Sequence, residues 1–426
     1  MRNIAFTICA KNYIGLAQVL EKSIKNNNPE IEFYIFVADE FEEEQLLPNN
    51  VLIAREVLDI SDDEWNQMTF KYDLTEFCTS IKPTCFKYVF EECKPDKCIY
   101  FDPDIFVFSS LDNIYEQLNN YSIILTPHIT TLEINYSGSL NERNLLYSGM
   151  FNLGFIALKA DENSAKMLNW WEVRLKDRCF QNMMENYFTD QKWMDFLPSF
   201  FPNKLLISSD LGLNLAPWNF HEREISVVDN CIFVSNRIEL NIQKKYKLVF
   251  VHFSGISYKA LLDEDIKHHN LNSLVFFEDL LCLFKLYRIA LSKSDFLSFI
   301  NYQYSYNYFS NSRRVSAIHR KLFRRLYEDG KNLGNPFNSN EFFYEKLKNN
   351  GLIGDKLVDS DKSSINNITS VESKTITINR VLNLLYKIIG SERYFLLTRL
   401  MRLYSITENH VFLIDKEYFK RFKIKN

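Results

Sequence analysis

Apolar and polar positions alternate in blocks along the first hundred residues of the chain. Ile4 to Ala10 is a continuous apolar run, which is typical of a strand that is covered on both faces. Apolar residues then recur at helical spacing over 16–24, and the sequence Asn-Asn-Asn-Pro at 26–29 ends this predicted helix. Residues 31–38 (IEFYIFVA) predict a second strand.

The same alternation continues to about residue 265. Pro83 can occupy the first turn of a helix, because the N–H that proline lacks would have no helical partner there. Three further apolar runs predict strands, at 98–101, 151–158 and 248–253. This order of elements favours an α/β fold with a mainly parallel sheet and helices on both faces.

Beyond about residue 265 the pattern becomes helical. Helices are predicted over 271–291 and 313–327, and again from 375 to 426, where the chain is also basic. Between them, residues 355–374 are polar and rich in Ser and Asn, which is typical of a linker. The expected division is a catalytic domain followed by a mainly helical region, residues 1–265 and 266–426.

Composition narrows the classes of protein that need to be considered. Apolar residues make up 46% and charged residues 24% of the chain, as in ordinary globular proteins. A net charge of -4 makes no electrostatic case for binding nucleic acid. The eight Cys follow no disulfide framework, so we expect reduced thiols in a cytoplasmic protein. No stretch reaches the ~20 apolar residues of a membrane span, and no secretory cleavage site follows the apolar N-terminus.

The most informative motif is Asp102-Pro-Asp104, which places two carboxylates directly after a predicted strand. Ligands of an open α/β sheet bind outside the carboxyl ends of its strands. Paired carboxylate oxygens suit Mg²⁺ or Mn²⁺, and these ions bridge well to phosphate oxygens. An isolated Asp-x-Asp is equally compatible with a capped turn, because Asp is also a good capping residue.

Four further motifs accompany this pair in a fixed order along the chain. They are FTICAKNY at 6–13, MFNLG at 150–154, the pair Asp190-Gln191, and HFSGISYK at 252–259. Together the series resembles the GT-A nucleotide-sugar transferases, in particular the retaining glycosyltransferases of family 8 and their bacterial relatives. The resemblance runs from residue 2 to about residue 260.

The resemblance implies a role for each motif. Asp102, Asp104 and His252 would hold a divalent metal ion, Mn²⁺ or Mg²⁺. The remaining matched residues would contact the nucleotide-sugar: Thr7, Ala10, Asn12 and Tyr13 at the nucleotide, Asn152 and Gly154 beside the sugar, Gly255 and Lys259 at the diphosphate, and Asp190 and Gln191 at the reacting carbon. Lys259 stands one residue later than the lysine of the family's H-x-x-G-x-x-K motif.

The expected chemistry is sugar transfer with a nucleotide diphosphate as leaving group. A metal ion would act as a Lewis acid on the diphosphate, and Lys82 or Lys259 could add positive charge there. Retaining hydrolases use a carboxylate nucleophile on the sugar carbon. At the matching position this chain has the amide of Gln191, which can stabilise a cation but is a poor nucleophile. The resemblance therefore implies front-face substitution with retention of configuration.

Ordinary structural explanations exist for the same residues. The alternatives are a turn or helix cap at Asp102, Asp104 and Asp190, a core histidine at His252, a β-bulge at 152–154, an ordinary turn at 12–13 and a solvated side chain at Lys82. His128 and Trp218 could contact the sugar or belong to the core. The four Cys between 78 and 98 contain no C-x₂-C pair, so buried thiols are favoured over a zinc site.

The expected partners are a nucleotide-sugar, with a UDP-sugar favoured, and a glycan acceptor such as a bacterial surface glycan. The basic segment 371–426 could lie on an anionic membrane, which would suit a lipid-linked acceptor, or pack on its own domain or on a second copy. A rival enzyme class is nucleotidyl transfer, but the turn at 10–15 has a single Gly rather than a Gly-rich phosphate loop. A second rival is an inactive sugar-binding or scaffold protein, which predicts damage at three metal-binding positions that are all intact here.

Overall fold

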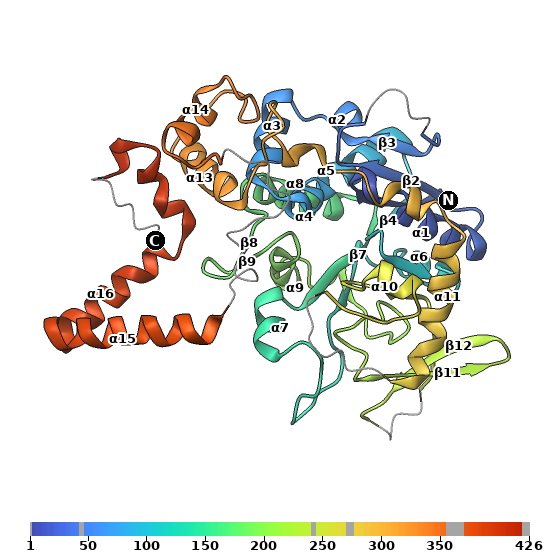
Figure 1. Ribbon diagram of the computed structural model, residues 1–426. Helices are drawn as coiled ribbons and strands as arrows, with labels where there is room; N and C mark the ends of the chain where they lie inside the picture. Colours follow the sequence, from blue (N-terminus) through green and yellow to red (C-terminus); the bar gives the residue numbers. More distant parts are fainter. Residues whose placement is uncertain (1, 42–46, 240–243, 270–276, 355–369, 420–426) are drawn as a thin grey trace. The chain divides into compact units, whose positions relative to one another are not determined.

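The computed structural model describes residues 2–41, 47–239, 244–269, 277–354 and 370–419, and the structural statements below refer to these residues (Figure 1). Contacts divide the chain into two compact units. Unit 1 comprises Met1–Ile60 and Leu74–Tyr304, and unit 2 comprises Ser61–Asp73 and Ser305–Asn426. Each unit is described separately.

Unit 1 is built on a seven-stranded sheet with the strand order β10-β6-β7-β4-β1-β2-β3. Its strands, in chain order, are β1 (Asn3–Cys9), β2 (Glu32–Val37), β3 (Val51–Ile53), β4 (Lys97–Phe101), β6 (Ile123–Pro127), β7 (Phe151–Lys159) and β10 (Leu205–Ile207). Neighbouring strands run parallel except at β7, which is antiparallel to both β4 and β6. The expected fold class is therefore confirmed: a mainly parallel sheet flanked by helices, with further helices towards the C-terminus.

Alternate residues of β1 face opposite sides of the sheet, as the period of two along a strand requires. Ala5 and Cys9 join one core cluster with Ile14, Leu20 and other residues of α1 (Ile14–Asn27). Phe6 points to the opposite side, where its ring lies edge-on to that of Phe86 in α5 (Lys82–Tyr88), at 4.7 Å between centroids. Helix α5 in turn packs against α8 (Glu162–Arg178). Both faces of the sheet are thus covered, which explains why its strands are continuous apolar runs.

A second, two-stranded sheet brings a distant part of the chain to the end of β4. Strand β5 (Ile105–Val107) follows β4 after a short turn and pairs antiparallel with β14 (Phe250–His252). The other strands of unit 1 are β8 (Gln181–Asn182), β9 (Tyr187–Phe188), β11 (Arg223–Val228), β12 (Cys231–Asn236) and β13 (Tyr246–Lys247). Its other α-helices are α2 (Ala54–Val57), α4 (Leu74–Ser80), α6 (Asp112–Gln117), α7 (Glu142–Ser148), α9 (Leu197–Phe200), α10 (Tyr258–Leu262), α11 (Leu281–Ser292) and α12 (Phe296–Phe299). It also contains the 3₁₀-helices η1 (Lys11–Tyr13), η3 (Gln191–Phe196) and η4 (Glu278–Leu280) and the π-helix η2 (Val89–Cys93).

Unit 1 extends past residue 265, the expected end of the first domain. Leu283 and Phe284 of α11 and Phe296 of α12 share a buried cluster with Leu16 of α1. Gly15 permits this approach, because a Cβ there would lie 2.6 Å from the Cα of Phe296. Helices α11 and α12 are therefore part of the packing of the sheet domain.

Unit 2 is helical and combines α3 with the C-terminal part of the chain. Its elements are α3 (Asp62–Lys71), α13 (Ala317–Glu328), α14 (Phe342–Asn349), α15 (Val371–Ile389), α16 (Ser391–Tyr404) and the 3₁₀-helices η5 (Ser305–Asn307), η7 (Thr407–Leu413) and η8 (Lys416–Phe419). Phe70 of α3 lies in one buried cluster with Phe323, Phe343 and Val411. Arg320 of α13 donates to the carbonyl oxygens of Thr69, Phe70 and Tyr72 at 2.6–2.8 Å, so a buried guanidinium holds the end of α3.

Most predicted elements are present, with some shifts. The last predicted strand is shorter than expected and belongs to the small β5–β14 sheet rather than to the main sheet. The helix predicted to start at residue 271 begins as α11 at Leu281, after residues 270–276, which lie outside the described part of the chain. Residues 355–369 of the predicted linker also lie outside it, and the linker's last residues already belong to α15, which starts at Val371.

Candidate metal centre and donor site

Asp102 and Asp104 lie on a tight turn between β4 and β5. The N–H of Asp102 donates to the carbonyl oxygen of Gly154 on the neighbouring strand β7 at 2.7 Å. The N–H of Ile105 then donates back to the carbonyl of Asp102 at 3.1 Å, which closes the turn. Both carboxylates are therefore positioned by backbone bonds at the carboxyl end of a buried strand, where ligands of open α/β sheets bind.

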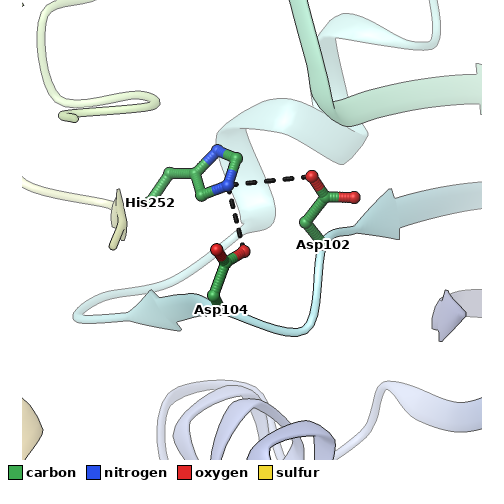
Figure 2. Close-up of side chains that lie close together, drawn as sticks. All are labelled: Asp102, Asp104 and His252. Atoms are coloured by element: carbon green, nitrogen blue, oxygen red, sulfur yellow. Dashed lines mark ion pairs between the residues drawn. The ribbon is translucent and has the colours of Figure 1, made fainter. Parts of the chain in front are cut away.

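The pairing of β5 with β14 brings His252 to these carboxylates. In the register of this small sheet, His252 stands opposite Ile105, the residue after Asp104. Nε2 of His252 lies 3.0 Å from Oδ1 of Asp104 and 3.7 Å from Oδ2 of Asp102, as Figure 2 shows. Ligand atoms of all three residues lie within 4.8 Å of one another. The predicted metal-binding residues are thus brought together.

A hydrogen bond fixes which nitrogen of His252 faces the carboxylates. Nδ1 of His252 lies 3.1 Å from Oδ1 of Asn152. The backbone N–H of Gly154 also bonds this atom, at 3.1 Å, and because an N–H can only donate, the atom must be the amide oxygen. Nδ1 of His252 is therefore the protonated nitrogen, and in the neutral ring the lone pair of Nε2 points towards Asp102 and Asp104.

Two further residues hold Asn152 and His252 in place. Asn214, which is fully buried, donates from Nδ2 to Oδ1 of Asn152 at 3.3 Å and to Oγ1 of Thr126 at 2.9 Å. Gly154 leaves room for the imidazole, since a Cβ at this position would lie 2.7 Å from Nδ1 of His252. The resemblance of the motifs implied that Asn152 and Gly154 lie beside the sugar, and in this structure both lie against the imidazole of His252.

The electrostatics of the cluster fit a site that holds positive charge. Burial lowers the pKa of His252, but the facing carboxylates of Asp104 and Asp102 outweigh it, so the pKa is raised from its ordinary value. Burial raises the pKa of Asp102, and Lys82 and His252 oppose this. Tyr100, a residue that the sequence analysis missed, donates to Oδ1 of Asp102 at 2.5 Å. Burial and Asp102 raise the pKa of Tyr100, which keeps its hydroxyl protonated and able to donate.

Lys82 and Asp190 form a buried ion pair next to this cluster. Nζ of Lys82 donates to Oδ2 of Asp190 at 2.6 Å and to the carbonyl of Leu153 at 2.9 Å, and it lies 4.1 Å from the centre of the Tyr100 ring. Their side chains are only 1% and 3% exposed, so Lys82 is not a solvated lysine. Gln191 is buried too and donates from Nε2 to the carbonyl of Ser148 at 2.9 Å.

The nucleotide-binding opening predicted at 6–13 comprises the second half of β1 and the 3₁₀-helix η1 (Lys11–Tyr13) that follows it. Oγ1 of Thr7 and Oδ1 of Asn12 are buried and have no hydrogen-bond partner among the described residues. Burial and the charge of Asp104 raise the pKa of Tyr13, which places this phenol near the cluster. Its ring lies edge-on to that of Tyr258 at 6.1 Å. Ala10, which stands between β1 and η1, is buried.

The closing motif is only partly assembled at the site. Gly255 follows β14 with φ of +71°, which glycine adopts without strain, and a Cβ there would meet the ring of His268. Lys259 is exposed on α10, whereas Lys82 is the lysine buried beside the carboxylates.

Trp218 lies between two histidines of the site. Its ring is edge-on to His252 at 5.2 Å and to His128 at 5.4 Å between centroids. Trp218 is 5% exposed, and its Nε1 has no hydrogen-bond partner among the described residues. His128 bonds through Nδ1 to the carbonyl of Gly149 at 2.9 Å and is buried, so it supports the site rather than facing solvent. In the sequence, the feature that drew attention to Trp218 was the stretch 214–219, in which amide and apolar residues are mixed.

The turn that carries Asp102 and Asp104 thus stands at the end of β4, a central strand of a mainly parallel sheet with one antiparallel strand. No family model matches the chain. It is 24% identical over 266 residues to the uncharacterized protein YfnF of Bacillus subtilis (strain 168), a match that covers 61% of this chain and 83% of that protein.

The solved structures that resemble the chain include glycosyltransferases. The galactosyltransferase LgtC, solved with donor and acceptor sugar analogs, is 17% identical, with 59% of this chain and 87% of that chain covered and a TM-score of 0.35. GlyE of Streptococcus pneumoniae TIGR4 is 13% identical, with 72% and 66% covered and a TM-score of 0.34. WbbM, a bifunctional glycosyltransferase, is 14% identical, with 70% and 51% covered and a TM-score of 0.38.

Proposed function

We propose that this protein is a metal-dependent glycosyltransferase that moves a sugar from a nucleotide-diphosphate donor, with a UDP-sugar favoured, to a glycan acceptor. The observation that carries the proposal is the cluster of Asp102, Asp104 and His252 at the end of β4, with ligand atoms within 4.8 Å of one another. The bond from Nδ1 of His252 to Asn152 supports it, because it turns the other ring nitrogen towards the carboxylates.

The donor set fits Mn²⁺ or Mg²⁺. Carboxylate oxygens suit both ions, and an imidazole nitrogen suits Mn²⁺ better, since Mg²⁺ is bound mostly by oxygen. Three side chains leave coordination positions for phosphate oxygens of a donor. When bound, the ion would supply Lewis-acid stabilisation of the charge that develops on the leaving diphosphate.

The buried pair of Lys82 and Asp190 supports a retaining mechanism without a carboxylate nucleophile. Asp190 already bonds Lys82 through Oδ2 and accepts from Thr189 through Oδ1 at 3.1 Å, so its charge is compensated. Gln191 is oriented by its donation to the carbonyl of Ser148. In this proposal the amide oxygen of Gln191 faces the sugar carbon and stabilises its positive charge, while the acceptor hydroxyl attacks from the same face as the leaving group.

Residues of β1 and of the short helix after it support a nucleotide as the leaving group. Thr7 and Asn12 each present a buried oxygen that no described residue satisfies, and buried polar atoms are ordinarily hydrogen-bonded. A nucleotide supplies both hydroxyl and ring N–H donors for such oxygens. Gly255 and Lys259 would complete the diphosphate contacts. The acceptor class, a bacterial surface glycan assembled in the cytoplasm, follows from the resemblance of the motifs.

Metal-stimulated turnover of the donor tests this function. The purified full chain is incubated with Mn²⁺ and a panel of UDP-sugars, and release of UDP is measured. We expect release from one or a few donors, dependence on metal, and a loss of about 100-fold or more in Asp104→Asn, because a metal ligand is removed. Asp229→Asn, at an exposed turn position of unit 1, is the matched control.

Three outcomes would contradict parts of the proposal. UDP release that is unchanged when the metal ion is chelated would contradict a catalytic role for the metal cluster. No release with any donor would favour the inactive sugar-binding protein, and formation of a nucleotide-sugar from a sugar phosphate would favour a nucleotidyltransferase. An inverted anomeric configuration in the NMR spectrum of a transfer product would end the retaining mechanism.

A further inference from the structure

Helices α15 and α16 of unit 2 contain no buried residue. Their large apolar side chains are instead exposed to solvent, with exposed fractions between 43% and 71%: Val371, Ile376, Ile378, Val381, Leu384, Tyr386, Ile388, Phe395, Leu396, Leu400 and Met401. Helices of globular proteins are stabilised mainly by burial of an amphipathic face, and among the described residues nothing covers the exposed face of this pair.

From residue 378 to residue 388, the large aliphatic residues of α15 lie on one side of the helix, whereas Ile376 lies on the opposite side. Ile378, Val381, Leu385 and Ile388 recur at spacings of three and four residues, which places them on one face. Arg380 is two positions after Ile378 and lies on the opposite face, and Lys387 lies one heptad further along that face. Over residues 378–388 the helix is therefore amphipathic, with an apolar side and a basic side.

The two helices are attached to the folded part of unit 2. Gly390, at φ of +79°, ends α15 and begins α16, and the rings of Tyr386 and Tyr394 meet edge-on across this bend at 5.5 Å. After α16 the chain enters η7, whose Val411 is in the buried core cluster of the unit. The hairpin formed by 371–404 is thus anchored at its C-terminal end, and Figure 1 shows its two helices in red.

Charge indicates which partner covers this hairpin. Residues 371–404 contain six Lys and Arg against two Glu, although the whole chain has a net charge of -4. A second copy would bring the same basic surface against itself, and like charges at an interface disfavour association. An anionic surface is complementary. No helix in the described ranges is long and apolar enough to cross a membrane, which is consistent with a helix that lies along a surface.

We propose that the hairpin 371–404 is a peripheral membrane-binding element, which inserts its apolar side chains between the headgroups of anionic phospholipids. Basic residues near the surface add electrostatic attraction to that burial. This inference rests on unit 2 alone and stands independently of the reaction proposed for unit 1. If both hold, the enzyme would act where lipid-linked acceptors are found.

Vesicle flotation of the full chain tests the proposal. With vesicles of phosphatidylcholine and phosphatidylglycerol at about 7:3, we expect the fraction of wild-type protein that floats to be roughly tenfold larger than with pure phosphatidylcholine. High salt should reduce this fraction, because it screens the attraction between basic residues and anionic headgroups. Val381→Asp/Ile388→Asp, at positions that are 61% and 71% exposed, should reduce flotation by about tenfold or more. Arg380→Glu/Lys387→Glu should do the same through charge.

A matched control carries the same apolar-to-acid changes on exposed helix positions of unit 1. Val173→Asp/Leu281→Asp, at 67% and 50% exposure, should leave flotation unchanged. Absence of wild-type flotation would overturn the proposal, as would equal binding to neutral vesicles or no effect of the charge reversal. A dimer that Val381→Asp/Ile388→Asp dissociates, without flotation, would show that a second copy covers the hairpin instead. Circular dichroism of each variant confirms that the helices persist.

Discussion

Nδ1 of His252 lies 3.1 Å from the amide oxygen of Asn152, and this bond determines which side of the imidazole faces Asp102 and Asp104. The three candidate metal ligands come from β14 and from the turn after β4, but Asn152 belongs to β7. The candidate site is therefore built by three separate segments. Asn152 acts through His252 and is a positioning residue.

Substitution of Asn152 should weaken metal binding although Asn152 is not itself a predicted ligand. In Asn152→Ala the imidazole loses the acceptor that fixes its tautomer, and loss of such partners typically costs about 10–100-fold in metal affinity. Titration calorimetry with Mn²⁺ measures this directly. Asn169→Ala, at an exposed position of α8, should bind Mn²⁺ as the wild type does. Equal Mn²⁺ affinities of the two variants would contradict a positioning role for Asn152.

Gly154 should be intolerant of even a single methyl group. A Cβ at this position would lie 2.7 Å from Nδ1 of His252 and 2.9 Å from Oδ1 of Asn152, so the imidazole or the amide must move. We expect Gly154→Ala to lower the free energy of unfolding by about 1–3 kcal/mol, as overpacking does, and to weaken Mn²⁺ binding as well. Gly354→Ala is the control, because a Cβ there meets no atom within 4 Å. Wild-type behaviour of Gly154→Ala in urea unfolding and Mn²⁺ titration would contradict this packing.

Sequence patterns predicted the central strands well because their physical signal is local. β1, β2, β4 and β7 are buried on both faces, so each is a continuous apolar run that can be recognised without its neighbours. Strand order and direction depend on contacts between distant segments, and the antiparallel direction of β7 left no mark in its own residues. The inclusion of 61–73 in unit 2 has the same cause, because Arg320 holds the end of α3 from about 250 positions away.

The candidate site was predicted to a similar extent. Asp102 and Asp104 stand out locally as carboxylates after an apolar strand, and the ordered motifs pointed to His252. The ion pair between Lys82 and Asp190 spans 108 positions, and no local pattern distinguishes this lysine from a solvated one. Tyr100 looked like an ordinary strand aromatic, since only its hydroxyl reveals the contact with Asp102.

The pair of Lys82 and Asp190 should be strongly coupled in stability. Removal of one partner of a buried pair leaves an uncompensated charge and typically costs about 3–5 kcal/mol. We expect Lys82→Met and Asp190→Leu each to be destabilised by this order, and the double variant to be more stable than the sum of both losses predicts. Urea unfolding of the wild type, the two single variants and the double variant measures this coupling as a double-mutant cycle. The exposed pair of Lys166 and Glu162 is the control and should show no measurable coupling.

Burial of His128 should contribute to the acid sensitivity of the fold. Burial lowers the pKa of His128 to about 4, while the unfolded chain takes up the proton near 6.5. The unfolded state therefore binds more protons between these values, so stability is full above about pH 6.5 and falls as the pH drops towards 4, by up to about 3 kcal/mol. His128→Asn, which retains a side-chain N–H donor, should show a shallower dependence in urea unfolding from pH 4 to 7. Parallel curves for the two proteins would contradict this assignment.

The most direct test of the central claim is the thermal stability of the full chain with UDP, in Mn²⁺ and in EDTA. A ligand that binds only the folded state stabilises it by about 2.7 kcal/mol at a hundredfold excess over its Kd. We predict that UDP raises the Tm only when Mn²⁺ is present, that Asp104→Asn abolishes the rise, and that Asp229→Asn retains it. A rise that is the same in EDTA or in Asp104→Asn, or no rise under any condition, would contradict a metal-dependent nucleotide site at Asp102, Asp104 and His252.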